Sequence, residues 1–156
     1  MLHVFVIMVG KTREKFIQEG ISFYQKRLQP FLNLTLLTIR EEKESDGLTP
    51  ELIKIREGTF LLGKVPPRAF EIALTPGGRQ FSSEEFAAWL TGMELASRPL
   101  AFLIGGHWGL SDGVIANAHE RLSLSRLTLT HELTRLVLLE QLYRAMTIRA
   151  GHPYHV

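Results

Sequence analysis

The sequence predicts an α/β fold with a mostly parallel β-sheet flanked by helices. Short apolar runs alternate along the whole chain with longer segments in which apolar residues recur at helical spacing. The chain has 156 residues, of which 45% are hydrophobic, so it can bury one sizeable core but has no room for a second independent domain. We therefore expect a single domain over residues 1–156.

The first elements are predicted from periodicity and from residues that end helices. Leu2–Val9 is a continuous apolar run, which is typical of a strand buried on both faces of a parallel sheet. A helix is expected from Thr12 to Leu28, with Thr12 as its N-cap and Pro30 just beyond its end. Leu32–Ile39 is predicted to be the second strand.

The middle of the chain continues the alternation after a charged loop at Arg40–Gly47. Proline at the first helical position, serine caps and apolar runs bounded by turn residues mark the next elements. These are a helix from Pro50 to about Gly63, a strand at Phe70–Leu74, a helix capped by Ser82 or Ser83 and ending near Leu95, and a strand at Leu100–Ile104.

The last quarter is predicted to contain a short helix from Asp112 to about Glu120, a strand at Leu124–Leu129 and a long helix at His131–Ile148. The long helix carries apolar residues around its whole circumference. A helix of this kind is buried on all sides, against its own sheet and against a second subunit. The pattern therefore predicts a homodimer.

Composition excludes several classes of protein. The net charge of +2 and a pI near 9.1 are too mild for a protein that binds nucleic acid through phosphate electrostatics alone. The chain has no cysteine, hence no disulfide and no thiolate zinc site, and its histidine spacing matches no catalytic metal motif. The start lacks the features of a signal peptide and is too short to cross a bilayer. We expect a cytoplasmic protein without metal or membrane attachment.

Ligands of open parallel sheets bind beyond the carboxyl ends of the strands, which directs attention to three loops. These are Thr75–Gly78, Gly105–Gly109 and the segment around Thr128. The glycine spacing at 105–109 matches neither a dinucleotide fingerprint nor a P-loop, so an ordinary turn is the better interpretation of that motif on its own. Hydroxyl residues between Ser123 and Thr130 alternate with leucines, which indicates a strand whose polar side could hydrogen-bond a heterocycle.

The C-terminal third also holds five of the six histidines, and the chain ends on the unusual segment Gly151–Val156. Tyr154 could stack on an unpaired base and His155 could move a proton, or the segment could simply dock on its neighbours. Arg144 follows Glu140 at the spacing of a helical ion pair, which is favoured over a contact between Arg144 and an anion.

The ordered set of these segments resembles RlmH, a SPOUT-class family that methylates N3 of a pseudouridine in large-subunit (23S) ribosomal RNA. The resemblance covers nearly the whole chain. The residues that carry it are Leu74 with Gly78, Phe102–Gly106 with Gly109 and Leu110, Leu122–Ser125, Leu127 with Thr128, His131, Arg135, Glu140–Ala145 and Pro153–His155.

The resemblance implies a C-terminal trefoil knot and a homodimer in which the partner completes the active site. Because the chain is only mildly basic, free RNA should bind poorly, and an assembled ribosome or subunit is the expected substrate. The resemblance also implies S-adenosylmethionine as cofactor and Arg144, Tyr154 and His155 as catalytic residues, with His131 and Glu140 in support. The implied cofactor contacts, mostly through main-chain groups, are Leu74, Gly106, Ser125, Arg126, Leu127, Thr128, Leu129 and Thr130.

Two positions depart from the family pattern: His107-Trp108 stands where relatives often have Pro-Glu, and Thr75-Pro76 where many have an aspartate. Two alternatives remain open. One is a knotted methyltransferase with another RNA nucleotide as target. The other is a dimeric RNA-binding or assembly factor that does not use the cofactor.

Overall fold

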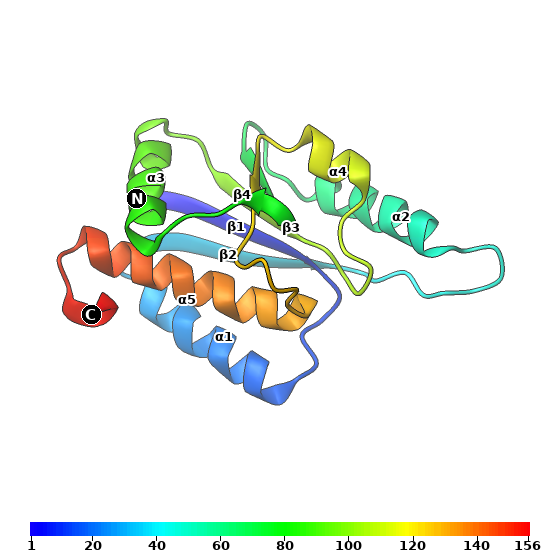
Figure 1. Cartoon of the computed structure of the whole chain (residues 1–156), viewed down its shortest axis with the longest axis horizontal. Coiled ribbons are helices and arrows are strands. Elements are labelled where there is room, and N and C mark those ends of the chain that lie inside the picture. The colour runs from blue at the N-terminus through cyan, green and yellow to red at the C-terminus, as the bar shows by residue number, and fades with distance from the viewer.

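The computed structural model describes all residues 1–156 and contains one five-stranded parallel sheet with helices on both faces (Figure 1). The strand order is β2-β1-β4-β3-β5, and every neighbouring pair is parallel. The elements are β1 (Leu2–Val9), α1 (Lys15–Leu28), β2 (Leu32–Ile39), α2 (Pro50–Gly63), β3 (Phe70–Arg79), α3 (Ser83–Leu95), β4 (Leu100–Ile104), α4 (Asp112–Asn117), β5 (Glu120–Leu122), α5 (His131–Arg149) and a 3₁₀ turn at Pro153–His155. The predicted fold class is confirmed.

Alternating residues of the central strands form two apolar layers. Val4 and Val6 of β1 face the layer formed with α1, α3 and α5, whereas Ile7 and Val9 face the smaller layer formed with α2 and α4. All of β4 is buried, as its continuous apolar run predicts. No helix is both long and apolar enough to serve as a membrane span.

Two helix boundaries differ from the sequence prediction. The first helix begins at Lys15 with Glu14 as its N-cap, so the prediction that Thr12 caps it is wrong. The hydroxyl of Thr12 instead accepts a hydrogen bond from Arg135 at 2.8 Å, a long-range contact that local sequence does not reveal. The short helix α4 ends at Asn117 rather than near Glu120.

The largest correction concerns the predicted strand at Leu124–Leu129, which is a loop; the fifth strand lies earlier, at Glu120–Leu122. Local side-chain hydrogen bonds explain the difference. The Ser123 hydroxyl donates to the Ser125 carbonyl at 2.9 Å, and the Ser125 hydroxyl accepts from the Leu127 N–H at 3.0 Å. Such bonds satisfy main-chain groups in a turn and compete with strand pairing.

Strand β3 is longer than predicted because it continues through the expected turn to Arg79. Gly78 permits this close approach, since a Cβ at that position would lie 2.7 Å from main-chain atoms of Leu122 in β5. The pairing between β3 and β5 shifts register between Leu74 and Arg79. The residues between these two pairs, 75–78, therefore bulge out at the carboxyl edge of the sheet.

No residue of helix α5 is fully exposed, because each is buried or half-buried. It packs between α1 and α3 on one face of the sheet. Its first turns are held by two charged side chains: Arg135 donates to the Val9 carbonyl at 2.6 Å, and Glu132 accepts the N–H groups of Arg13 and Glu14 at 3.0 and 2.9 Å. These bonds fix the start of α5 against the end of β1.

We predict that Arg135→Met lowers the free energy of unfolding by roughly 1–3 kcal/mol, because the buried Val9 carbonyl loses its donor while the apolar volume is largely kept. Urea unfolding followed by circular dichroism measures this. Arg40→Met on the exposed loop before α2 is the matched control and is expected to change stability little. Equal stabilities of the two variants would contradict the role given to Arg135.

Candidate functional site

Three loops meet at the carboxyl edge of the sheet and enclose a cavity of about 560 Å³. They are residues 74–76 within β3, residues 104–109 from the end of β4, and residues 122–134 from the end of β5 to the first turn of α5. The last segment crosses from the edge strand β5, past the ends of β3 and β4, to the start of α5 beside β1. The trefoil knot expected from the resemblance concerns this crossing and stays a prediction.

The floor of the cavity is apolar and its β4 turn is tight. Leu74, Ile104, Leu122 and Leu124 supply aliphatic surface. The turn after β4 requires glycine at position 105, since a Cβ there would lie 2.4 Å from the carbonyl carbon of Gly109. The glycines therefore let main-chain groups approach a ligand closely.

The crossing loop offers main-chain hydrogen-bonding groups to the cavity. Between residues 124 and 129 no main-chain group bonds to another main-chain group, and the one N–H that is bonded within this segment is that of Leu127. Residues 126–128 are exposed, so their free main-chain donors and acceptors are available to a ligand. A heterocyclic ligand in the cavity would provide partners for them.

The cavity wall contains no lysine, arginine, aspartate or glutamate, and its titratable side chains are His107 and His131. Burial lowers the pKa of His131, and the nearby charge of Arg135 lowers it further, although Glu132 acts in the opposite direction. His131 is therefore neutral at neutral pH. Such a wall suits an uncharged heterocycle and lacks the cations that a polyphosphate needs.

The structure places all of the predicted cofactor contacts in the cavity wall except Arg126. Arg126 borders a neighbouring recess together with Gln80 and Phe81 on the other side of the crossing loop. His107 and Trp108, whose contact with a ligand the sequence does not determine, both line the cavity. Their rings meet edge to face, with centroids 4.9 Å apart.

The predicted catalytic residues lie elsewhere in the same chain. Arg144 is on α5, roughly 15 Å along the helix axis from Thr134 in the cavity wall. The C-terminal turn with Tyr154 and His155 packs at the far end of α5, opposite the carboxyl edge of the sheet (Figure 1). One protomer thus presents the two halves of the predicted site at opposite ends of one helix.

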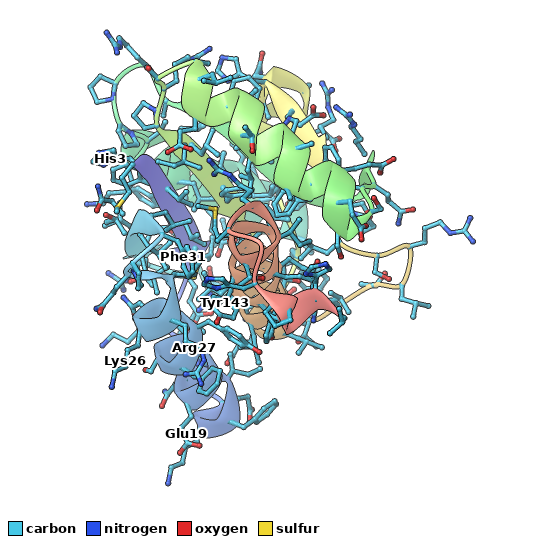
Figure 2. The ribbon with its side chains drawn as sticks, turned by 90° about the vertical axis from the view of Figure 1, so that its left-hand side faces the viewer. His3, Glu19, Lys26, Arg27, Phe31 and Tyr143 are labelled. Carbon is cyan, nitrogen blue, oxygen red and sulfur yellow. The ribbon has the colours of Figure 1, made fainter.

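The C-terminal turn is held by an aromatic cluster, which we define as Tyr24, Phe31, Tyr143, His152 and Tyr154. The Tyr143 ring lies 4.8 Å from that of Tyr154 and 6.1 Å from that of Phe31, and Figure 2 shows Phe31 and Tyr143 side by side next to this turn. The Tyr154 hydroxyl lies 3.4 Å from that of Tyr24. The end of the chain is therefore placed by contacts, although residues 151–156 remain exposed.

Charge and hydrogen bonds set the chemistry of this turn. Arg144 forms the expected ion pair, with its Nε 3.0 Å from a Glu140 oxygen, and its guanidinium lies 4.9 Å from the Tyr154 ring centroid. Partial burial raises the pKa of Tyr154, and the hydrogen bond with Tyr24 raises it further. The Tyr154 hydroxyl therefore keeps its proton and is not a base, whereas hydrogen bonding to Glu140 raises the pKa of Arg144 and keeps it charged.

Two features of the site were missed by the sequence analysis. The buried carboxyl of Glu57 lies behind Gly106, and the buried guanidinium of Arg135 lies behind the start of α5. Arg135 belongs to the residues that carry the resemblance but received no role, and Glu57 was not singled out. No local pattern marks either residue, because both act on segments distant in sequence.

The comparisons with known proteins agree with this fold. The chain resembles two solved structures: a probable methyltransferase from Bordetella pertussis (TM-score 0.51, 15% identity, 93% of this chain and 96% of that chain) and a probable methylase family protein from Haemophilus influenzae (TM-score 0.54, 11% identity, 96% and 67%). A family model described as "Predicted SPOUT methyltransferase" matches residues 2–155. The class is therefore that of the SPOUT methyltransferases.

More similar relatives carry the name ribosomal RNA large subunit methyltransferase H. Proteins from Clostridioides difficile and Listeria monocytogenes are 40% and 41% identical, and one from Methanoregula boonei, named as putative, is 47% identical, each over 99% of both chains. The chain belongs to the RlmH family of SPOUT methyltransferases. The predictions of this family and of a methyltransferase enzyme are confirmed.

The lowered pKa of His131 predicts a pH dependence of stability. The unfolded chain takes up a proton near the ordinary histidine pKa of about 6.5 before the folded one does, so the free energy of unfolding falls as pH decreases from about 6.5 through the lower folded-state pKa. In His131→Asn this contribution is absent. Urea unfolding at several pH values between 8 and 5 measures the difference, with His3→Asn as an exposed control. A His131→Asn profile parallel to that of the wild type would contradict the assignment.

Proposed function

We propose that the chain is an S-adenosylmethionine-dependent methyltransferase that modifies N3 of a pseudouridine in large-subunit (23S) ribosomal RNA. It acts as a homodimer of the single domain formed by residues 1–156, on the assembled ribosome in the cytoplasm. The observation that carries the proposal is the neutral cavity lined by main-chain groups, in a chain up to 47% identical to proteins named ribosomal RNA large subunit methyltransferase H.

The cavity fits the proposed cofactor. Leu74 and the other aliphatic residues of the floor would hold the adenosine, and main-chain groups of Gly106 and of residues 125–130 would hydrogen-bond it. The neutral imidazole of His131 avoids repulsion of a positive sulfonium. When bound, S-adenosylmethionine supplies the electrophilic methyl group, so the chain itself needs to orient the acceptor and remove the N3 proton.

Three residues near the C-terminus would handle the acceptor base. The Tyr154 ring would stack on the base, and the fixed positive charge of Arg144 would favour the negative charge that develops as the N3 proton leaves. His155 would accept that proton. Tyr154 is unsuited to this task because its raised pKa keeps the hydroxyl protonated.

The proposed site requires two protomers. The cavity and the C-terminal residues lie at opposite ends of α5, so the two halves of the site would come together across a twofold interface. The layer of α1 and α5 also leaves large apolar side chains in solvent: Phe16 is 64% and Phe23 is 47% exposed. A second subunit packed on this layer would cover them.

Transfer of a labelled methyl group from S-adenosylmethionine to purified ribosomes, followed by mapping of the modified base, tests the proposal. We expect label at N3 of one pseudouridine and much less label on naked RNA, since the chain is only mildly basic. Label on another nucleotide would support the alternative target, and equal label on naked RNA would contradict the ribosome as substrate.

A stability measurement on the same protein distinguishes a methyltransferase from a factor that does not use the cofactor. S-adenosylmethionine at a hundredfold excess over its dissociation constant should stabilise the wild-type fold by about 2.7 kcal/mol. A factor that does not use the cofactor would show no stabilisation and no transfer.

Complementation tests whether the site forms between protomers. Leu129→Trp fills the cavity from its half-buried loop, and the pair of changes Tyr154→Ala and His155→Ala removes the acceptor residues. Each variant is expected to be inactive by itself. In dimers that carry one copy of each, one of the two composite sites is intact, so random co-expression should restore about a quarter of the wild-type activity. No recovery would show that one chain supplies both halves of a site.

A further inference from the structure

Glu57 is a buried carboxyl group directly behind the cavity. It lies on α2, its side chain is 3% exposed, and its Oε2 accepts the main-chain N–H of Glu42 at 3.0 Å. Its other oxygen, Oε1, has no hydrogen-bond partner within the protein. Arg135 Nε is the only other buried side-chain polar atom without one.

The unpartnered oxygen faces the loop that lines the cavity. A Cβ placed on Gly106 would lie 3.3 Å from Glu57 Oε1 and 3.0 Å from Val9 Cγ1. The loop main chain at Gly106 therefore passes within reach of the carboxyl, with no side chain between them. On its other side the same glycine lines the cavity.

Helix α2 holds this carboxyl rigidly. The next residue, Gly58, packs against the start of α4, since a Cβ there would lie 2.8 Å from Val114 Cγ2 and 3.2 Å from Ser111 Oγ. Ser111 caps α4 and ends the segment that begins at Gly105. Glu57 thus lies against the start of the loop of residues 105–111, and Gly58 lies against its end.

The bond from the Glu42 N–H explains one oxygen of this carboxyl but not the other. A buried polar oxygen without a partner costs free energy, so Oε1 by itself does not stabilise the fold. Burial raises the pKa of Glu57, the hydrogen bond from Glu42 lowers it, and the charges of Glu41 and Glu42 raise it again. Geometry thus leaves Oε1 as a buried polar atom that lacks a hydrogen-bond partner.

We propose that Glu57 is a positioning residue for the cofactor loop, in which Oε1 accepts a main-chain N–H of the Gly105–Gly109 turn when that turn holds S-adenosylmethionine. The inference rests on the proposed function of the cavity. The hydrogen bond would fix the turn from behind, so that the main-chain groups of Gly106 that face the cavity are oriented for the ligand. Glu57 itself does not touch the cofactor.

Glu57→Gln tests this inference because it changes one atom. The amide oxygen can still accept from Glu42, but the amide nitrogen then faces the turn and cannot accept an N–H. Glu44→Gln, the same change at an exposed loop residue that forms no hydrogen bond or ion pair, is the matched control. Calorimetry with S-adenosylhomocysteine measures the dissociation constant, and urea unfolding without ligand measures stability.

We expect Glu57→Gln to weaken S-adenosylhomocysteine binding by about tenfold or more, the effect of one hydrogen bond to a charged acceptor. Unfolding without ligand should match that of Glu44→Gln, since Oε1 has no bond to lose. Wild-type affinity in Glu57→Gln would overturn the inference. Weaker binding together with a lower free energy of unfolding than the control variant would also overturn it. If the wild type does not bind the ligand, the proposed function fails together with the inference.

A measurement on the unaltered protein covers the case in which Glu57→Gln does not fold. With glutamate labelled by ¹³C at its carboxyl carbon, the titration of Glu57 is followed by NMR with and without S-adenosylhomocysteine. A new N–H bond favours the charged form, so ligand binding should lower the pKa of Glu57. Glu41 and Glu42, the titratable groups that act on it, are followed in the same spectra. An unchanged Glu57 titration would overturn the inference.

Discussion

The attachment of α5 to the end of β1 is the contact on which the site depends. Arg135 is 1% exposed, and its guanidinium bonds the Val9 carbonyl and the Thr12 hydroxyl, while Glu132 receives two N–H groups of the following loop. A buried arginine without such acceptors would be costly, so the helix start is confined to this place. Because β5 lies at the edge of the sheet, the chain that leaves β5 must cross the ends of β3 and β4 to reach the end of β1.

That crossing creates the cavity and also separates the two halves of the proposed site. The loop of residues 123–130 closes over the ends of two strands and presents main-chain groups that have no partner in the fold. Helix α5 then carries Arg144 and the C-terminal turn away from the cavity. A single helix thus links a ligand cavity at one end to an aromatic cluster at the other, and the proposed twofold dimer would unite them.

Most elements could be predicted because their signals are local. The apolar runs at Leu2–Val9, Leu32–Ile39 and Leu100–Ile104 match the observed strands, and the Ser82 cap marks the start of α3. The prediction failed at Leu124–Leu129, where alternation suggested a strand but the serine hydroxyls bond the main chain of a turn. Alternation cannot distinguish these outcomes, because it does not reveal whether a neighbouring strand is available for pairing.

The sequence by itself determined the alternation of strands and helices, the burial of the last helix on all sides, and, through its resemblance to a family, the residues expected at the site. Those properties depend on periodicity and on residue order. Only the tertiary structure decided that Glu57 lies behind Gly106, that Trp108 lines the cavity and that Tyr154 packs far from it. Such distances depend on which strand ends become neighbours in the sheet, and strand order results from packing between segments far apart in the chain.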